Sequence, residues 1–239
     1  MDFIAHLPLF SRLDAAAVGL LIVLSLAIGW VIDHPNTIRP SVSVLMMEYR
    51  REWMREFVTR DPRIYDATVL DGLRQGITFY ASACIIAIGS GLALVGNTAP
   101  LEGLATDLTL AAASALVLKV KVVLVLAFVV NAFLKFVWSH RLFGYCSILM
   151  AAVPNDPAHP DCYPRAAQAA EINITAARGY NRGLRSVYFA LGALGWFLGP
   201  VPLLVSAFAT MLVLLRREFA SQSRAIMLTR GGPPSQPTR

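Results

Sequence analysis

The chain has 239 residues and a mass of 26.0 kDa, and 56% of its residues are hydrophobic, which gives a mean hydropathy of +0.57. This composition leaves too little polar surface to cover a soluble particle of that size, so a large soluble domain is excluded. The formal net charge is +6, and the three cysteines lie far apart without a CxxC pair. Neither a disulfide framework nor a zinc site is therefore expected.

Four runs of the sequence are long and apolar enough to cross a bilayer, which takes about 20 residues for a hydrocarbon layer of about 30 Å. Three of them contain no charged residue: Ala15 to Ile32, Gly76 to Gly96 and Val187 to Leu215. The remaining run, Leu108 to Trp138, carries the polar residues Lys119, Lys121, Asn131 and Lys135. We therefore expect an all-α membrane helix bundle of about four transmembrane helices over residues 1–225, followed by a disordered tail, 226–239.

The connection between the first two spans contains a predicted amphipathic helix, Ser41 to Val58. Its apolar side chains recur at intervals of three and four residues, at Val42, Met46, Tyr49, Trp53 and Phe57. Such a helix can lie in the headgroup region, pack on its own bundle or contact a second subunit. The sequence pattern leaves these three alternatives open.

The connection after the third span divides into three parts. Leu142 to Val153 is too short to cross and is expected to continue the third helix or to lie at the interface. The prolines between positions 154 and 164 predict an extended, non-helical segment. The acidic, histidine and cysteine residues in this segment lack the fixed spacing of metal ligands, so no metal site is expected there. Arg165 to Tyr180 is rich in alanine and is expected to be helical.

The last apolar run is interrupted by Leu198-Gly-Pro-Val-Pro202. We expect one long, kinked span here, because proline is common in membrane helices. The alternative is a re-entrant hairpin of two half-helices, each of about 13 residues. The hairpin would return the arginine-rich tail to the side from which the segment entered.

Lysine and arginine residues predict the orientation, because basic connections stay in the cytoplasm. The two long connections are rich in arginine, whereas Asn97 to Asp107 contains no basic residue. We expect a multi-pass protein of the cell inner membrane, with both long connections cytoplasmic and the N-terminus outside. Four simple crossings would place the basic tail outside, which disagrees with the same rule.

The polar residues of the third run predict a polar pathway formed by Lys119, Lys121, Asn131 and Lys135. A lysine near the middle of a bilayer costs about 2.5 to 3.5 kcal/mol and is tolerated where water or an anion accompanies it. At about 100° per residue, Lys121 and Lys135 lie on one helix face with Asn131 beside them, while Lys119 points nearly opposite. We expect Lys119 and Lys121 to lie in the bundle interior or at an oligomer axis. Alternatively, the span starts near Lys119, and the side chains of Lys119 and Lys121 extend to the outer surface of the membrane.

Four arginines near the predicted inner ends of the third and fourth spans form a candidate site for anionic lipid headgroups. Each basic residue near an anionic surface contributes about 1 kcal/mol, and a guanidinium group can bind phosphate at two points. The alternative is that these charges only set the topology. The residues are Arg141, Arg178, Arg182 and Arg185.

Three segments carry a family resemblance: Phe133-Leu-Lys-Phe-Val-Trp-Ser139, Asn181-Arg-Gly-Leu-Arg185 and Arg216-Arg-Glu-Phe-Ala-Ser221. Together with the order of the predicted elements, these segments make the chain resemble a family of bacterial and plant integral membrane proteins catalogued only as a domain of unknown function. The resemblance covers about Asp14 to Arg224. The resemblance implies a helical membrane protein and no established activity.

We expect a non-enzymatic membrane protein. The leading interpretation is an oligomeric, anion-favouring pathway for small ions or solutes, and the alternative is a subunit or partner of a membrane complex. A lipid-modifying enzyme is the third class of function. Against it, the histidines are scattered along the sequence and form no catalytic motif. The polar pairs Asp71 with Arg74 and Glu171 with Arg178 are explained by charge compensation at helix ends. We expect no catalytic residues, cofactor, metal or nucleic acid. The expected partners are the bilayer and its anionic lipids, with a second copy or a membrane complex as further candidates.

Overall fold

The computed structural model describes residues 10–34, 38–99 and 114–229, and in these ranges the regular structure is entirely helical. The all-α prediction is therefore confirmed. The elements are α1 (Arg12–Asp33), α2 (Val42–Phe57), α3 (Ile64–Gly96), α5 (Ala115–Ala151), α6 (Cys162–Ala193), the 3-10 helix η2 (Leu194–Leu198), α7 (Pro200–Phe219) and α8 (Gln222–Leu228). The helix α8 continues into the predicted tail, of which residues 230–239 lie outside the described ranges.

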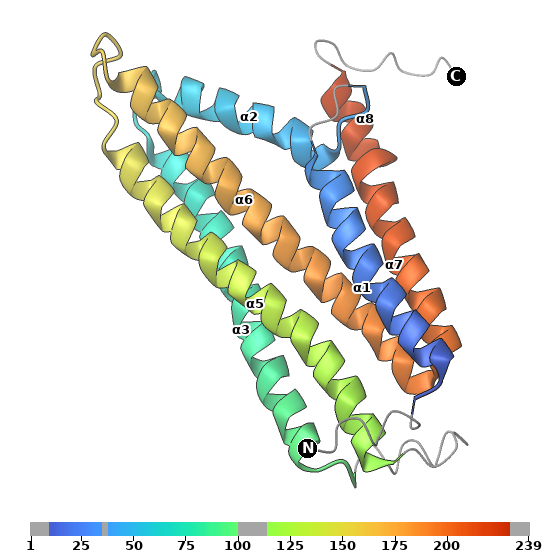
Figure 1. Ribbon diagram of the computed structural model, residues 1–239. Coiled ribbons are helices and arrows are strands. Elements are labelled where there is room, and N and C mark those ends of the chain that lie inside the picture. The colour runs from blue at the N-terminus through green and yellow to red at the C-terminus, as the bar shows by residue number, and fades with distance from the viewer. Residues whose placement is uncertain (1–9, 35–37, 100–113, 230–239) are drawn as a thin grey trace, which may run out of the picture.

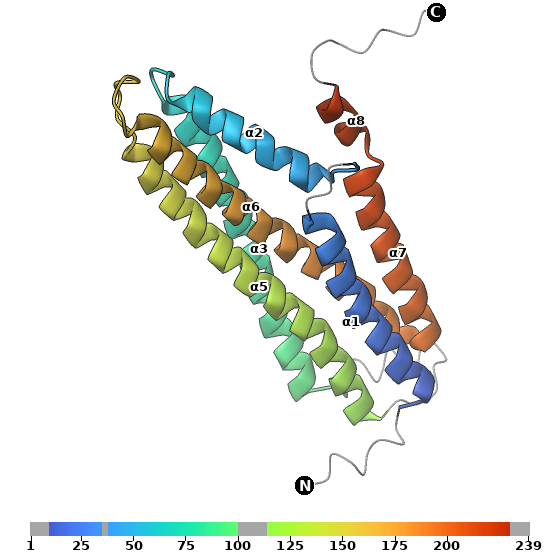
Figure 2. The ribbon, with the colours of Figure 1, turned by 45° about the horizontal axis from the view of Figure 1, so that its top comes forward.

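The long helices run lengthwise between two ends of the molecule, and α2 lies across one of them (Figure 1). This α2 end also holds α8 and the connection between α5 and α6, residues 152–161. The opposite end, here called the turn end, holds η2 and the first residues of α1, α5 and α7. Figure 2 shows the same arrangement from a second direction.

Three helices are long and apolar enough to cross a membrane: α1, α3 and α5. Many of their apolar side chains face outward, including Leu26 at 70%, Phe79 at 70% and Ile86 at 71% exposure, as lipid-facing positions require. At about 1.5 Å per residue, the 33 residues of α3 and the 37 residues of α5 exceed the thickness of the hydrocarbon layer. The predicted span Leu108 to Trp138 starts outside the described residues, since α5 begins at Ala115.

The predicted single kinked span, Val187 to Leu215, is wrong because this segment is a hairpin. The helix α6 ends at Ala193, and Gly199 then adopts a φ of 122°, a conformation that favours glycine. Pro200 begins α7, which runs back beside α6 and α1. The Ser206 hydroxyl donates a 2.6 Å hydrogen bond to the carbonyl of Gly192 across the turn. With 32 residues in α6 and 20 in α7, this hairpin is larger than the two half-helices considered as the alternative.

The amphipathic helix predicted from Ser41 to Val58 is present as α2, and its apolar stripe faces the protein's own bundle. Met54 and Phe57 are buried. The Trp53 indole donates to the buried carboxylate of Asp66 on α3 at 2.6 Å. On the other side, Arg51 pairs with Glu171 of α6 at 2.7 Å. Among the three alternatives left by the sequence, the structure therefore favours packing on the bundle.

The helix α6 lies between two hydrophobic clusters. Its first half packs with α2, α3 and α5 around Phe136 and Phe143. Its second half packs with α1 and α7 around Leu21, Phe189 and Leu203. Because α6 is shared, residues distant in sequence on α1 and α5 are brought to the same part of the molecule.

The two segments on either side of the prolines are helical. Leu142 to Val153 continues α5, which ends at Ala151, and Arg165 to Tyr180 lies within α6. The α6 helix therefore extends from the α2 end to the turn end, and its two halves contact different neighbours.

Candidate functional site

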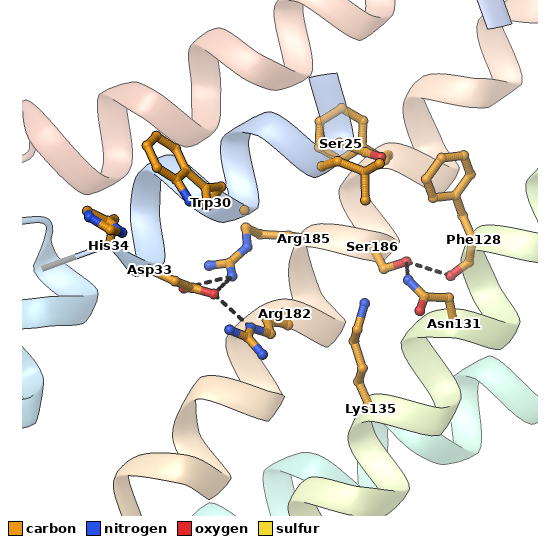
Figure 3. A pocket seen from close by; sticks show the side chains of 13 residues that line it. Ser25, Trp30, Asp33, His34, Phe128, Asn131, Lys135, Arg182, Arg185 and Ser186 are labelled. Carbon is orange, nitrogen blue, oxygen red and sulfur yellow. Dashed lines mark hydrogen bonds and ion pairs between the residues drawn. The ribbon is translucent and has the colours of Figure 1, made fainter. Parts of the chain in front are cut away.

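A cavity of about 440 Å³ lies between α1, α5 and α6, and we call it the central cavity (Figure 3). The helix α1 contributes its last turns to the cavity, α5 contributes its middle, and α6 contributes the segment from Arg182 to Phe189. The polar and charged lining residues are Ser25, Asp33, His34, Asn131, Lys135, Arg182, Arg185 and Ser186.

Asp33 holds the two arginines of α6 in the central cavity. Its carboxylate accepts hydrogen bonds from Arg182 Nε at 2.7 Å and from Arg185 Nη2 at 2.9 Å. The side chains of Asp33 and Arg185 are only 12% and 8% exposed. The Arg182 side chain is 50% exposed, so only the Asp33–Arg185 pair is shielded from water and stronger than a surface ion pair.

The α5 wall supplies an amide and a lysine. Asn131 Nδ2 donates to Ser186 Oγ at 2.9 Å, and this hydroxyl donates to the carbonyl of Phe128 at 2.8 Å. Lys135 extends into the cavity from α5 (Figure 3). Its ammonium group forms no hydrogen bond or ion pair with any residue in the described ranges.

The charges of the central cavity do not cancel. Three cations line it, and Asp33 is the one acid among its lining residues. Two cations already share that carboxylate, so Lys135 and part of the arginine charge remain uncompensated. A small anion would supply the missing negative charge and accept hydrogen bonds from the N–H groups that do not contact Asp33.

A second cavity of about 240 Å³, the α2 cavity, lies between α2, α6 and α7. It is lined by Arg50, Arg178 and Arg217 and also by the carboxylates of Asp33 and Glu218. Burial lowers the pKa of Arg50, whose guanidinium donates to Asn173 Oδ1. Asp33 therefore stands at the boundary of both cavities.

Arginines of α6 connect the two cavities along one helix face. Arg178, Arg182 and Arg185 follow at intervals of four and three residues, so they project in similar directions. Arg178 lines the α2 cavity and contacts Met47 Sδ at 3.1 Å, while the other two line the central cavity.

The four predicted pathway residues do not share one cavity. Asn131 and Lys135 line the central cavity. Lys121 is 9% exposed and lies at the turn end, with its Nζ 5.7 Å from the centre of the Trp196 ring. The same indole donates to Asp14 at 2.8 Å. Lys119 is half-buried and lines neither of the two cavities described above.

The four predicted headgroup residues are also separated. Arg182 and Arg185 share Asp33, and Arg178 lies in the neighbouring α2 cavity. Arg141 is exposed on α5 and donates to the hydroxyl of Tyr145 at 2.5 Å. Sequence analysis missed Asp33, although an acid directly after the charge-free run ending at Ile32 was a usable signal.

Comparison with known proteins identifies the family. The family described as "protein of unknown function, DUF599" matches residues 16–223. The chain belongs to this family. No curated protein and no solved structure matches the chain. The match agrees with the resemblance inferred from the sequence and brings no activity, so the function has to be argued from the cavities.

Proposed function

We propose that this protein is a non-enzymatic integral membrane protein that binds small anions in its central cavity, as part of an anion-favouring pathway for ions or solutes. The observation that carries the proposal is the positive excess in the cavity: Lys135, Arg182 and Arg185 face a single carboxylate, Asp33. A lysine held at membrane depth needs a counter-charge or water. A passing anion supplies that counter-charge.

The hairpin supports a consistent orientation. The helices α1, α3, α5, α6 and α7 alternate between the two ends, so the start of α1 and the end of α7 lie at opposite ends. The arginines of α2, of the start of α6 and of the end of α7 all lie at the α2 end. By the positive-inside rule this end is cytoplasmic, and the start of α1 is outside. The arginines at the end of α7 and in α8 then lie on the cytoplasmic side, as the positive-inside rule requires.

The two cavities suggest the inner part of the route. An anion would enter the α2 cavity beside Arg178, exchange with Asp33 on Arg182 and Arg185, and reach Lys135 in the central cavity. The successive arginines of α6 offer partners throughout this step, so the anion is not left without hydrogen-bond donors.

The test is anion flux through the purified protein in lipid vesicles, with wild type compared with Lys135→Met. We expect the wild type to pass anions in preference to potassium. The variant should pass them about fivefold more slowly, because one charge contributes on the order of 1 kcal/mol. Arg141→Gln is the matched control, since it removes a cation outside both cavities and should leave flux unchanged. Equal flux in wild type and Lys135→Met would contradict the proposal.

A membrane-complex subunit is the second candidate, and the outer face of α3 supports it. Phe79, Ile85, Ile86 and Leu92 on this helix are all exposed. They can contact lipid or another membrane helix. Vesicles without flux, together with stoichiometric native co-purification with another membrane complex, would favour this candidate.

A further inference from the structure

We propose a second binding site, separate from the anion cavities, for a phospholipid whose headgroup carries both a phosphate and an ammonium group. The site is a cavity of about 440 Å³ between the first half of α3 and the last turns of α2 and α5, here called the α3 cavity. In it, Arg74 would bind the phosphate and Asp71 the ammonium. The proposal does not depend on the function proposed for the central cavity.

Arg74 is the first observation. Its guanidinium forms no hydrogen bond or ion pair within the described ranges, and its Nε is buried without a partner. A buried N–H of a cation that lacks an acceptor is unfavourable, because it has lost its water and gained nothing in exchange. A phosphate oxygen is the acceptor that suits a guanidinium best.

Asp71 is the second observation. It lies three residues before Arg74 on α3 and lines the same cavity, yet the two form no ion pair in the described structure. Its carboxylate accepts a 2.9 Å hydrogen bond from Gln75 and keeps further lone pairs for another donor. A lone inorganic anion would meet repulsion from Asp71. A zwitterionic headgroup satisfies both side chains.

The rim of the cavity is held rigidly by Arg63. Its guanidinium donates to the carbonyls of Val153 and Pro154, both at 2.9 Å, and its central carbon lies 4.4 Å from the centre of the Phe57 ring. These contacts fix the ends of α2 and α5 against the start of α3. The site is therefore preorganised, which lowers the cost of ordering it around a ligand.

The walls of the cavity indicate an amphiphile. Phe57, Leu70 and Met150 are buried apolar side chains of the lining, and two alanines and the polar side chains of Ser147 and Asn155 also line it. Arg74 stands two residues before the charge-free run that starts at Gly76, so the polar groups lie at the level where that run would enter the hydrocarbon layer. Phospholipids place their phosphates at this level. The apolar walls then accommodate the adjoining acyl chain.

The test compares lipids with identical acyl chains. Purified full-length protein in detergent is titrated with phosphatidylethanolamine or phosphatidylcholine, and the shift of the melting temperature reports affinity. We expect wild type to bind phosphatidylethanolamine more tightly, because the trimethylated headgroup of phosphatidylcholine has no N–H to donate to Asp71. Arg74→Gln should weaken binding of both lipids about tenfold or more, as expected for the loss of a charge-assisted hydrogen bond.

Two further variants make the outcome specific. Asp71→Ala removes the acceptor and should abolish the preference between the two lipids while leaving phosphate binding in place. Arg216→Gln is the control, because Arg216 is exposed at the end of α7 and lines none of the three described cavities, and it should behave as wild type in both titrations. The proposal is overturned if Arg74→Gln binds the lipids as wild type does, if Asp71→Ala keeps the preference, or if inorganic phosphate alone reproduces the full shift.

Discussion

At the scale of single residues, Asp33 compensates part of the positive charge that lines the central cavity. It is the shared acceptor of Arg182 and Arg185 and lines both the central cavity and the α2 cavity. The bound carboxylate acts as an internal substitute for an anion. Any ligand that reaches the two arginines must compete with it.

We therefore predict that Asp33→Asn raises the affinity for sulfate, used as a divalent probe, and lowers the melting temperature without sulfate. Removing one partner of a shielded ion pair leaves an uncompensated charge and costs on the order of 3 kcal/mol. Sulfate should restore much of this loss. Asp161→Asn is the control, because its ion pair with Arg165 is exposed and contributes less than about 1 kcal/mol. Sulfate affinity equal to that of wild type would show that Asp33 does not compete.

At the scale of elements, the α6–α7 hairpin depends on a close approach at Gly195. A Cβ atom built there would lie 2.6 Å from Ser206 Oγ and 2.9 Å from the backbone oxygen of Pro202. The hydroxyl can rotate away, but the carbonyl belongs to the first turn of α7 and cannot move without it. Close packing of backbones is a common reason for glycine between membrane helices.

Gly195→Ala should consequently destabilise the protein by about 1 to 3 kcal/mol, as overpacking does elsewhere. Thermal unfolding in detergent measures the effect. Gly19→Ala is the matched control, since a Cβ at Gly19 meets no atom within 4 Å. At that helical position alanine should be neutral or stabilising by up to about 1 kcal/mol. Equal melting temperatures of the two variants would contradict the close approach.

At the scale of the whole molecule, the hairpin changes the side on which the chain ends. Single cysteines at position 198, in the turn, and at position 229, after α8, distinguish the topologies by labelling with an impermeant maleimide. Leu198→Cys should react from outside, whereas Thr229→Cys should react only after permeabilisation. The three native cysteines are buried and provide a low background. Reaction of position 229 from outside in intact cells would contradict the proposed orientation.

The sequence by itself determined the helical class, the apolar segments, the amphipathic α2 and the family. All of these follow from local periodicity and composition, which indicate where a helix forms and which of its faces is buried. Lys135 and Asn131 were also identifiable, because polar residues are conspicuous in an apolar run. Asp33 was not predicted as a site residue, because it lies just beyond the apolar run and its partners are on a distant helix.

Only the tertiary structure decided the hairpin and the cavities. Leu198-Gly-Pro-Val-Pro202 suits a kink as well as a reversal, and the choice depends on whether α7 finds a packing surface on α1 and α6. The partners Asp33 and Arg182 are 149 residues apart. They meet because α1 packs on α6, and no local pattern in the chain encodes where two distant helices cross.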